Sequence, residues 1–147
     1  MGIALSLAQR AQRVGEVPVG ALVVVDGKIV GVGHNRVICD HDSSSHAEIV
    51  AMRAASSYLQ NYRLSDASLY VTMEPCIMCA GAMLNARVRR LVFAARDERF
   101  GAAGSRLNLL ESPFMNHQCQ VFSGIMESES RFLLRHFFQS KREQPSG

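Results

Sequence analysis

Residues 68–95 read SLYVTMEPCIMCAGAMLNARVRRLVFAA, and this stretch decides the fold. Residues 68–73 are rich in β-branched and aromatic side chains, which is typical of a strand. Pro75 stands where a helix over residues 76–86 would begin, because its missing amide donor costs nothing in a first turn. Residues 90–95 (RLVFAA) then predict a second strand. A helix that crosses over between two such strands makes them a parallel pair.

Outward from this unit, the chain predicts further helices and strands on both sides. Asp26-Gly27 is a strong hairpin signal between two apolar runs, residues 21–25 and 29–32. Periodic apolar residues predict helices over residues 2–14, 46–58 and 125–142, and a short fifth strand is expected over residues 119–122. Together they predict a single domain over residues 1–147 with an α/β fold, a three-layer α/β/α sandwich around a mixed five-stranded sheet.

Composition excludes several classes of protein. A chain of 147 residues can bury a core without disulfide staples. Hydrophobic residues make up 48% and charged residues 20%, which argues against intrinsic disorder. No apolar run approaches the roughly 20 residues of a membrane-spanning helix, so no membrane partner is expected. The first residues do not resemble a signal peptide, so the expected compartment is the cytoplasm.

Cysteines and a histidine predict a metal site. Cys76 and Cys79 form a Cys-x-x-Cys pair at a helix start, a spacing that thioredoxin-like redox pairs share. His46 favours a metal, because its helix is expected to run beside that of the cysteines with both N-termini at one sheet edge. His46, Cys76 and Cys79 would give Zn²⁺ three protein ligands and leave the fourth position to water, as in catalytic sites.

Glu48, two residues after His46, favours a catalytic site over a structural one. It cannot bind the metal from the same face, yet it can reach a metal-bound water and carry its proton. The competing hypothesis is a closed site with Cys39, His41 or Cys119 as the fourth ligand. A loop thiol or a buried free thiol explains the two cysteines at least as well.

These residues resemble the signature of the zinc-dependent nucleobase deaminases, H-x-E followed by P-C-x-x-C. Almost the whole chain is similar to the bacterial tRNA-specific adenosine deaminases. The similar stretches are Glu16 to Ala21, Asn35, His46 to Glu48, Glu74 to Ala82, Ala95 to Asp97, Gly101 to Ser105 and Asn116-His117. The resemblance implies a cytidine deaminase-like fold and a homodimeric enzyme. Its reaction would be hydrolytic deamination of adenosine to inosine at the wobble position of a tRNA anticodon loop.

The resemblance also implies the roles of single residues. One zinc ion per subunit, held by the three ligands, would activate water, and Glu48 would be the proton shuttle. Asn35 would hydrogen-bond the flipped base, and Val17 would line its pocket. The backbone of Ala47 and the side chain of Asp97 would contact the base, its sugar or neighbouring nucleotides.

Positive charge gathers in residues 87–106, whose net charge is +4 against +3 for the whole chain. Guanidinium groups bind phosphate in a planar, bidentate way, so an acidic polymer is a fitting partner. The competing interpretation is a solvated surface, which the small net charge favours when it is considered alone. With the resemblance, Arg96, Arg99 and Arg106 are expected to hold phosphates of the tRNA anticodon stem-loop, where unstacked bases can be read.

The last helix adds a second basic surface, because Arg131, Arg135, Phe138 and Arg142 fall on one of its faces. The guanidinium groups of the arginines could bind phosphates, beside the Phe138 ring, on which a base can stack. The competing interpretation is a solvated face with Phe138 in the core.

Two other functions also stay open. A deaminase of free bases or nucleosides needs no arginine-lined surface, and a non-catalytic RNA-binding zinc subunit would have no need of Glu48.

Overall fold

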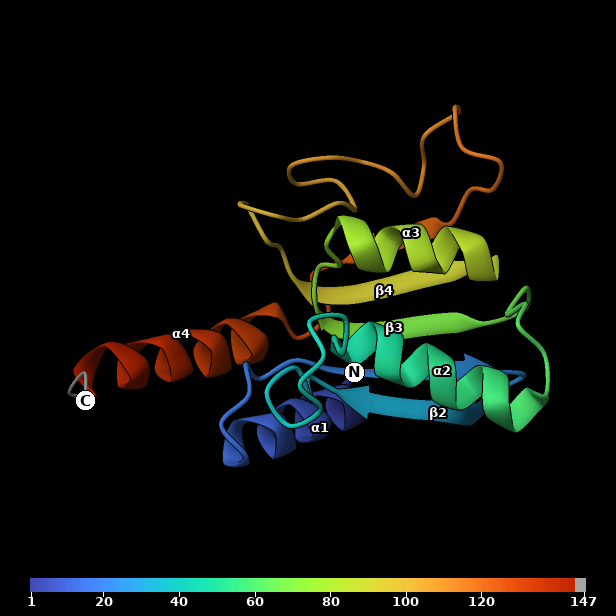
Figure 1. The fold of residues 1–147 in the computed structure, drawn as a ribbon. Helices are drawn as coiled ribbons and strands as arrows, with labels where there is room; N and C mark the ends of the chain where they lie inside the picture. The colour runs from blue at the N-terminus through green and yellow to red at the C-terminus, as the bar shows by residue number, and fades with distance from the viewer. Residues whose placement is uncertain (145–147) are drawn as a thin grey trace.

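The structure of the protein is a computed structural model that describes residues 1–144 (Figure 1). Its first elements are the helix α1 (Gly2–Arg13) and the strands β1 (Gly20–Val25) and β2 (Lys28–His34). The elements that follow are α2 (Ala47–Leu59), β3 (Ser68–Met73), α3 (Ile77–Ala86), β4 (Arg90–Ala95), β5 (Gln120–Ser123) and α4 (Glu127–Glu143). Every helix and strand expected from the sequence is present, with ends that differ by at most a few residues.

The five strands form one mixed sheet in the order β2-β1-β3-β4-β5. β1 is antiparallel to both β2 and β3, whereas β4 is parallel to β3 and to β5. The expected mixed sheet and its parallel β3–α3–β4 unit are thus confirmed. In this register β1 begins at the edge where β2, β3 and β4 end. Four segments border this edge although they are far apart in sequence: residues 16–19, which lead into β1, and residues 35–46, 74–76 and 96–105, which follow β2, β3 and β4.

Helices cover both faces of the sheet. A Cβ atom at Gly33 would lie 2.6 Å from the backbone nitrogen of Ala51 in α2, and one at Gly20 would lie 2.0 Å from the carbonyl oxygen of Ala4 in α1. Gly33 pairs with Ala21, the neighbour of Gly20 in β1. Because successive residues of a strand face opposite sides, α1 and α2 lie on opposite faces of the sheet. Figure 1 shows α2 and α3 on one face, running in the same layer.

The main core lies between the sheet and the layer of α2 and α3. Its largest fully buried side chains include Leu69 and Val71 of β3, Phe93 of β4 and Met83 of α3. Burial of such side chains is the main stabilising contribution to the fold. No helix in residues 1–144 is both long and apolar enough to cross a membrane.

Candidate active site

Three possible metal ligands meet where α2 and α3 begin. His46 is the N-cap residue of α2, Cys76 is that of α3, and Cys79 lies in the first turn of α3. The sulfur of Cys76 and that of Cys79 each lie 3.6 Å from Nδ1 of His46. The three ligand atoms all lie within 4.8 Å of one another, which suits a tetrahedral ion with bonds of about 2.0–2.3 Å. One imidazole and two thiolates are a donor set that fits zinc.

The other candidates for a fourth ligand lie elsewhere in the described residues, because the group of possible ligands contains only His46, Cys76 and Cys79. Cys119 is buried, and burial raises the pKa of its thiol to about 12. Cys39 is exposed in the loop after β2, where its backbone N–H donates to Glu16. The arrangement therefore offers three protein ligands and leaves one side of the site open.

The two thiols of the site have opposite proton affinities. A hydrogen bond from the Cys79 thiol lowers the pKa of Cys76 to about 4, assisted by His46. The same hydrogen bond raises the pKa of Cys79, to which burial also contributes. A hydrogen bond to Cys76 raises the pKa of His46. The site thus presents a thiolate at Cys76 at neutral pH, and the thiolate is the form that binds metal.

Glu48 lies in the first turn of α2 with only 4% of its surface exposed. Burial raises the pKa of its carboxyl group to about 7, because the charged form loses its hydration. A carboxyl group with a pKa near neutrality can both accept and donate a proton, which is what general acid–base catalysis requires.

A cavity of about 210 Å³ opens beside Glu48 and the possible metal ligands. Its lining residues are Val17, Val19, Asn35, His46, Glu48, Met73, Glu74, Cys76 and Asp97. The structure thus brings together most of the site residues expected from the sequence. Ala47 does not line the cavity but supports it, since its backbone N–H donates a hydrogen bond of 2.8 Å to Oδ1 of Asn35. With Oδ1 fixed in this way, Asn35 has its amide N–H groups to offer to a ligand.

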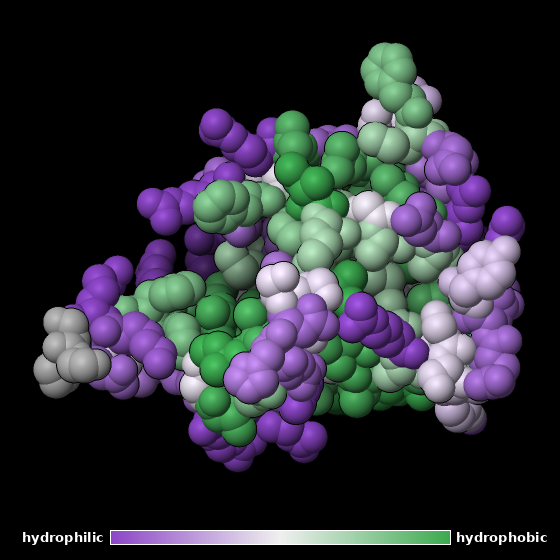
Figure 2. All heavy atoms as spheres, in the orientation of Figure 1, coloured by the Kyte–Doolittle hydropathy of each residue, from purple (hydrophilic) through white to green (hydrophobic). Residues whose placement is uncertain are grey.

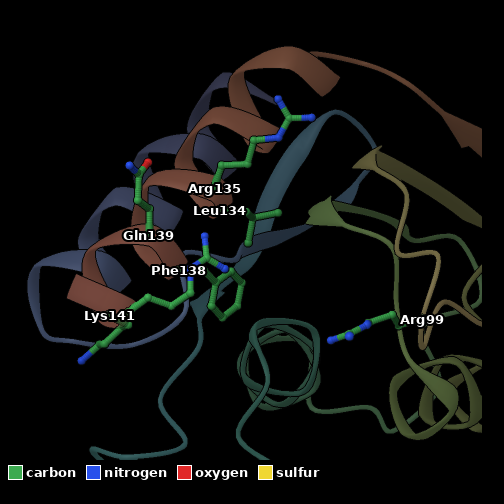
Figure 3. A pocket seen from close by; sticks show the side chains of 7 residues that line it. Arg99, Leu134, Arg135, Phe138, Gln139 and Lys141 are labelled. Carbon is green, nitrogen blue, oxygen red and sulfur yellow. The ribbon is translucent and has the colours of Figure 1, made fainter. Parts of the chain in front are cut away.

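A second, larger cavity of about 700 Å³ lies between α4 and the loop after β4 (Figure 3). It is lined by Arg99, Leu134, Arg135, Phe138, Gln139, Lys141 and Arg142, and we call it the basic groove. In Figure 3 Arg99 faces Phe138 and the other α4 side chains across this space. Phe138 is 44% exposed, so its placement in the core is wrong and its placement on the surface is confirmed.

The expected basic residues do not all lie in this groove. Arg131 forms two hydrogen bonds to Oε1 of Glu127, at 2.9 and 2.7 Å, and is absent from the groove lining. Arg96 donates a hydrogen bond of 3.3 Å to the hydroxyl of Ser123 and lies outside the groove as well. Arg99, Arg135 and Arg142 are therefore the expected phosphate-binding residues that share one surface.

Two buried glutamates at the same sheet edge had no expected role. Glu16 is 2% exposed and accepts backbone N–H groups of Ile38 and Cys39, at 2.9–3.1 Å. Burial opposes its ionisation, but these donors outweigh that effect and lower its pKa. Glu74 is 3% exposed and holds the loop after β4. Both residues adjoin motif residues in the sequence, yet nothing in a local pattern distinguishes a buried glutamate from a solvated one.

Known proteins are similar to this chain over nearly its whole length. Residues 1–142 match the MafB19-like deaminase family. The tRNA-specific adenosine deaminase of Haemophilus influenzae is 48% identical over 145 residues, which are 98% of this chain and 84% of that protein. A structure from a study of A-to-I editing by tRNA deaminases at the wobble position of transfer RNA has a TM-score of 0.88 at 42% identity, covering 91% of this chain and 97% of that chain. Guanine deaminase from Nitrosomonas europaea has a TM-score of 0.80 at 28% identity, covering 92% of this chain and 81% of that chain.

Proposed function

This chain belongs to the MafB19-like deaminases and, among them, to the bacterial tRNA-specific adenosine deaminases, and from this membership we propose its reaction. It converts adenosine to inosine by hydrolysis at the wobble position of a tRNA anticodon loop. The observation that carries this proposal is the cavity in which buried Glu48 lies beside His46 and Cys76, close to the basic groove. Water adds to carbon six of adenine, and ammonia leaves.

His46, Cys76 and Cys79 would hold one zinc ion in each subunit. Zinc bound there would supply a water molecule activated as a nucleophile at neutral pH. Glu48 takes the proton that this nucleophile gives up and passes it to the ring nitrogen next to carbon six. In the second half of the reaction Glu48 takes the proton of the new hydroxyl group on carbon six and delivers it to the amino group, which leaves as neutral ammonia while the carbonyl of inosine forms. A group that alternates between base and acid works best with a pKa near the operating pH, as burial arranges here.

The remaining cavity residues orient the base. Asn35, fixed through Oδ1 by the backbone of Ala47, donates its amide N–H to an acceptor of the flipped adenine. Val17 lines the apolar side of the pocket, and Asp97 lines the side nearest the loop after β4. A base must leave its stack to enter such a cavity, which is easiest in a loop of unpaired nucleotides.

The basic groove is the surface on which the anticodon stem-loop would lie. Arg99 and Arg135 offer planar forks to phosphates, and Phe138 offers a ring on which a base can stack. A deaminase of free bases would gain nothing from this surface. Because its proposed substrate is tRNA, we also place the enzyme in the cytoplasm.

We further propose that two copies form a homodimer, as the family resemblance implies. Figure 2 shows hydrophobic residues in the middle of one face, with hydrophilic residues around them. Ile77 and Met78, in the first turn of α3, are 56% and 37% exposed, and Leu107 is 45% exposed. Contact between two such apolar surfaces would remove them from water.

Incubation of the zinc-loaded protein with separate substrates tests the proposed reaction. The substrates are an anticodon stem-loop with adenosine at the wobble position, the same stem-loop with that adenosine moved to the stem, free adenosine, free cytidine and free guanine. Mass spectrometry of the digested products should find inosine from the first stem-loop alone. Turnover of a free base or nucleoside without turnover of the stem-loop would contradict the proposal and favour the free-base alternative.

A further inference from the structure

Glu74 is a buried carboxylate between the last residue of β3 and the Pro75-Cys76 turn. Its Oε1 accepts the backbone N–H of Asp97 at 3.1 Å and the hydroxyl of Ser105. Its Oε2 accepts the backbone N–H groups of Ala103 and Ser105, each at 3.0 Å. All four donors belong to the loop after β4, so one side chain binds both ends of this loop.

The loop after β4 packs tightly against the Glu74 carboxylate. A Cβ atom at Gly101 would lie 2.3 Å from Oε2 of Glu74 and 2.5 Å from the carbonyl oxygen of Asp97, so only glycine fits there. The N–H of Ala102 also donates to the carbonyl oxygen of Pro75 at 2.8 Å. The loop is therefore attached to the turn that carries Cys76, one of the three possible metal ligands.

This loop carries the residues that face the substrate. Asp97 lines the cavity, and Arg99 lines the basic groove. Oδ1 of Asp97 accepts the N–H groups of Arg99 and Phe100, at 3.0 and 3.2 Å, so the placement of Asp97 also sets that of Arg99. Glu74 itself also lines the cavity, but its side-chain hydrogen bonds go to this loop, so it bears on both surfaces through the backbone of Asp97.

We propose that Glu74 is a positioning residue, which holds Asp97 and Arg99 at a set place relative to the reactive centre so that they can bind the nucleotide and its neighbours. The inference rests on the proposed function for what these two residues bind. It assigns to Glu74 an effect on substrate binding, not on the chemical step.

Glu74→Gln tests this inference with almost no change in shape. The Oε2 position faces two backbone N–H groups that cannot turn away, so the new amide nitrogen must take the Oε1 position. There the Ser105 hydroxyl can reverse its hydrogen bond, but the N–H of Asp97 loses its acceptor. We expect KM for the stem-loop to rise about tenfold or more, the effect of one lost hydrogen bond to a charged group, while kcat stays within about threefold.

Glu98→Gln is the matched control, because Glu98 is an exposed residue of the same loop and the change removes the same charge. It should leave both KM and kcat unaltered. Ser105→Ala, which removes the hydroxyl alone, should raise KM less than Glu74→Gln, and it carries the test if Glu74→Gln does not fold. Unchanged KM in Glu74→Gln, or a fall in kcat at constant KM, would overturn the proposal.

Hydrogen exchange separates this inference from the proposed function. In Glu74→Gln, the backbone amides of residues 97–105 should exchange faster than in the unaltered protein, while those of α2 and α3 keep their rates. This measurement needs no substrate. Equal exchange of the loop in both proteins would overturn the positioning role, whereas an unaltered protein that leaves the stem-loop unmodified would contradict the function alone.

Discussion

Three glutamates of this protein are buried, and their hydrogen-bond partners decide what each can do. Glu16 and Glu74 accept sets of backbone N–H groups, which fix two loops. In Glu16 these donors outweigh burial and lower the pKa of the carboxyl group. Glu48 has no such set of backbone donors from other residues in the part of the chain that the structure describes, and burial raises its pKa to about 7. Two of these carboxylates are therefore suited to hold structure and the third to move protons.

Replacement of Glu48 by glutamine tests the proton shuttle at the scale of a single residue. The amide keeps the shape of the side chain but cannot accept or release a proton at neutral pH. We expect kcat on the stem-loop to fall by at least about a hundredfold, the usual contribution of general acid–base catalysis. Zinc content per chain, measured by plasma mass spectrometry, should stay unchanged.

Glu111→Gln, a change of an exposed glutamate away from the cavity, is the control for this variant and should keep full activity. A near-normal rate in Glu48→Gln would rule out the shuttle. Loss of zinc from the variant would show that Glu48 supports the metal site, so the loss of activity would then have another cause.

Among the elements, the contact between β2 and α2 sets the place of His46. Gly31 and Gly33 of β2 let α2 approach the strand closely. A Cβ atom at Gly31 would lie 2.4 Å from the carbonyl oxygen of Ala51, and one at Gly33 would lie 2.6 Å from its backbone nitrogen. His46 is the N-cap residue of the same helix and stands just before its first turn. The distance between β2 and α2 therefore determines whether His46 reaches Cys76 and Cys79.

Gly33→Ala should lower the free energy of unfolding by about 1–3 kcal/mol, the usual effect of overpacking. The added methyl group meets backbone atoms of α2, so the helix must shift, and His46 shifts with it. Urea unfolding measures the stability, and competition with a chelator measures the zinc affinity, which should also fall.

Gly2→Ala is the control, because a Cβ atom at Gly2 meets nothing within 4 Å. It should leave both stability and zinc affinity nearly unaltered. Normal zinc affinity in Gly33→Ala would show that the contact between β2 and α2 does not set the ligand geometry.

At the scale of the whole molecule, the small net charge of +3 conceals a strongly basic surface. Four cationic side chains line the basic groove: Arg99, Arg135, Lys141 and Arg142. Arg99 comes from the loop after β4 and the others from α4, so the groove exists only where these two segments face each other (Figure 3).

Binding of the stem-loop should therefore depend strongly on salt. If the four cations each contact a phosphate, the logarithm of the association constant should fall against the logarithm of salt concentration with a slope of about −3, roughly 0.7 for each contact. Fluorescence anisotropy with the Glu48→Gln variant measures this slope without turnover.

Arg135→Ala should make that slope shallower by about 0.7, whereas Arg131→Ala should leave it unchanged, since Arg131 is already paired with Glu127. Equal slopes in all three proteins would place the RNA on another surface.

Much of the fold was predictable because its signals are local. Asp26-Gly27 predicts a hairpin and Pro75 predicts a helix start, and neither prediction depends on distant parts of the chain. The strand–helix–strand pattern of residues 68–95 then requires a parallel pair. The possible ligands His46, Cys76 and Cys79 were recognisable for the same reason, since the residue types and their spacing within each short motif suit a metal. The domain division and the roles of the site residues stay predictions.

Sequence by itself thus determined the order of the elements, the family and the set of possible metal ligands. Only the tertiary structure decided which residues act together. It placed Phe138 on the surface opposite Arg99, and buried Glu16 and Glu74 beneath two loops. The physical reason is that burial and hydrogen-bond partners depend on segments far apart in sequence. In this protein the sheet brings those segments together at one edge.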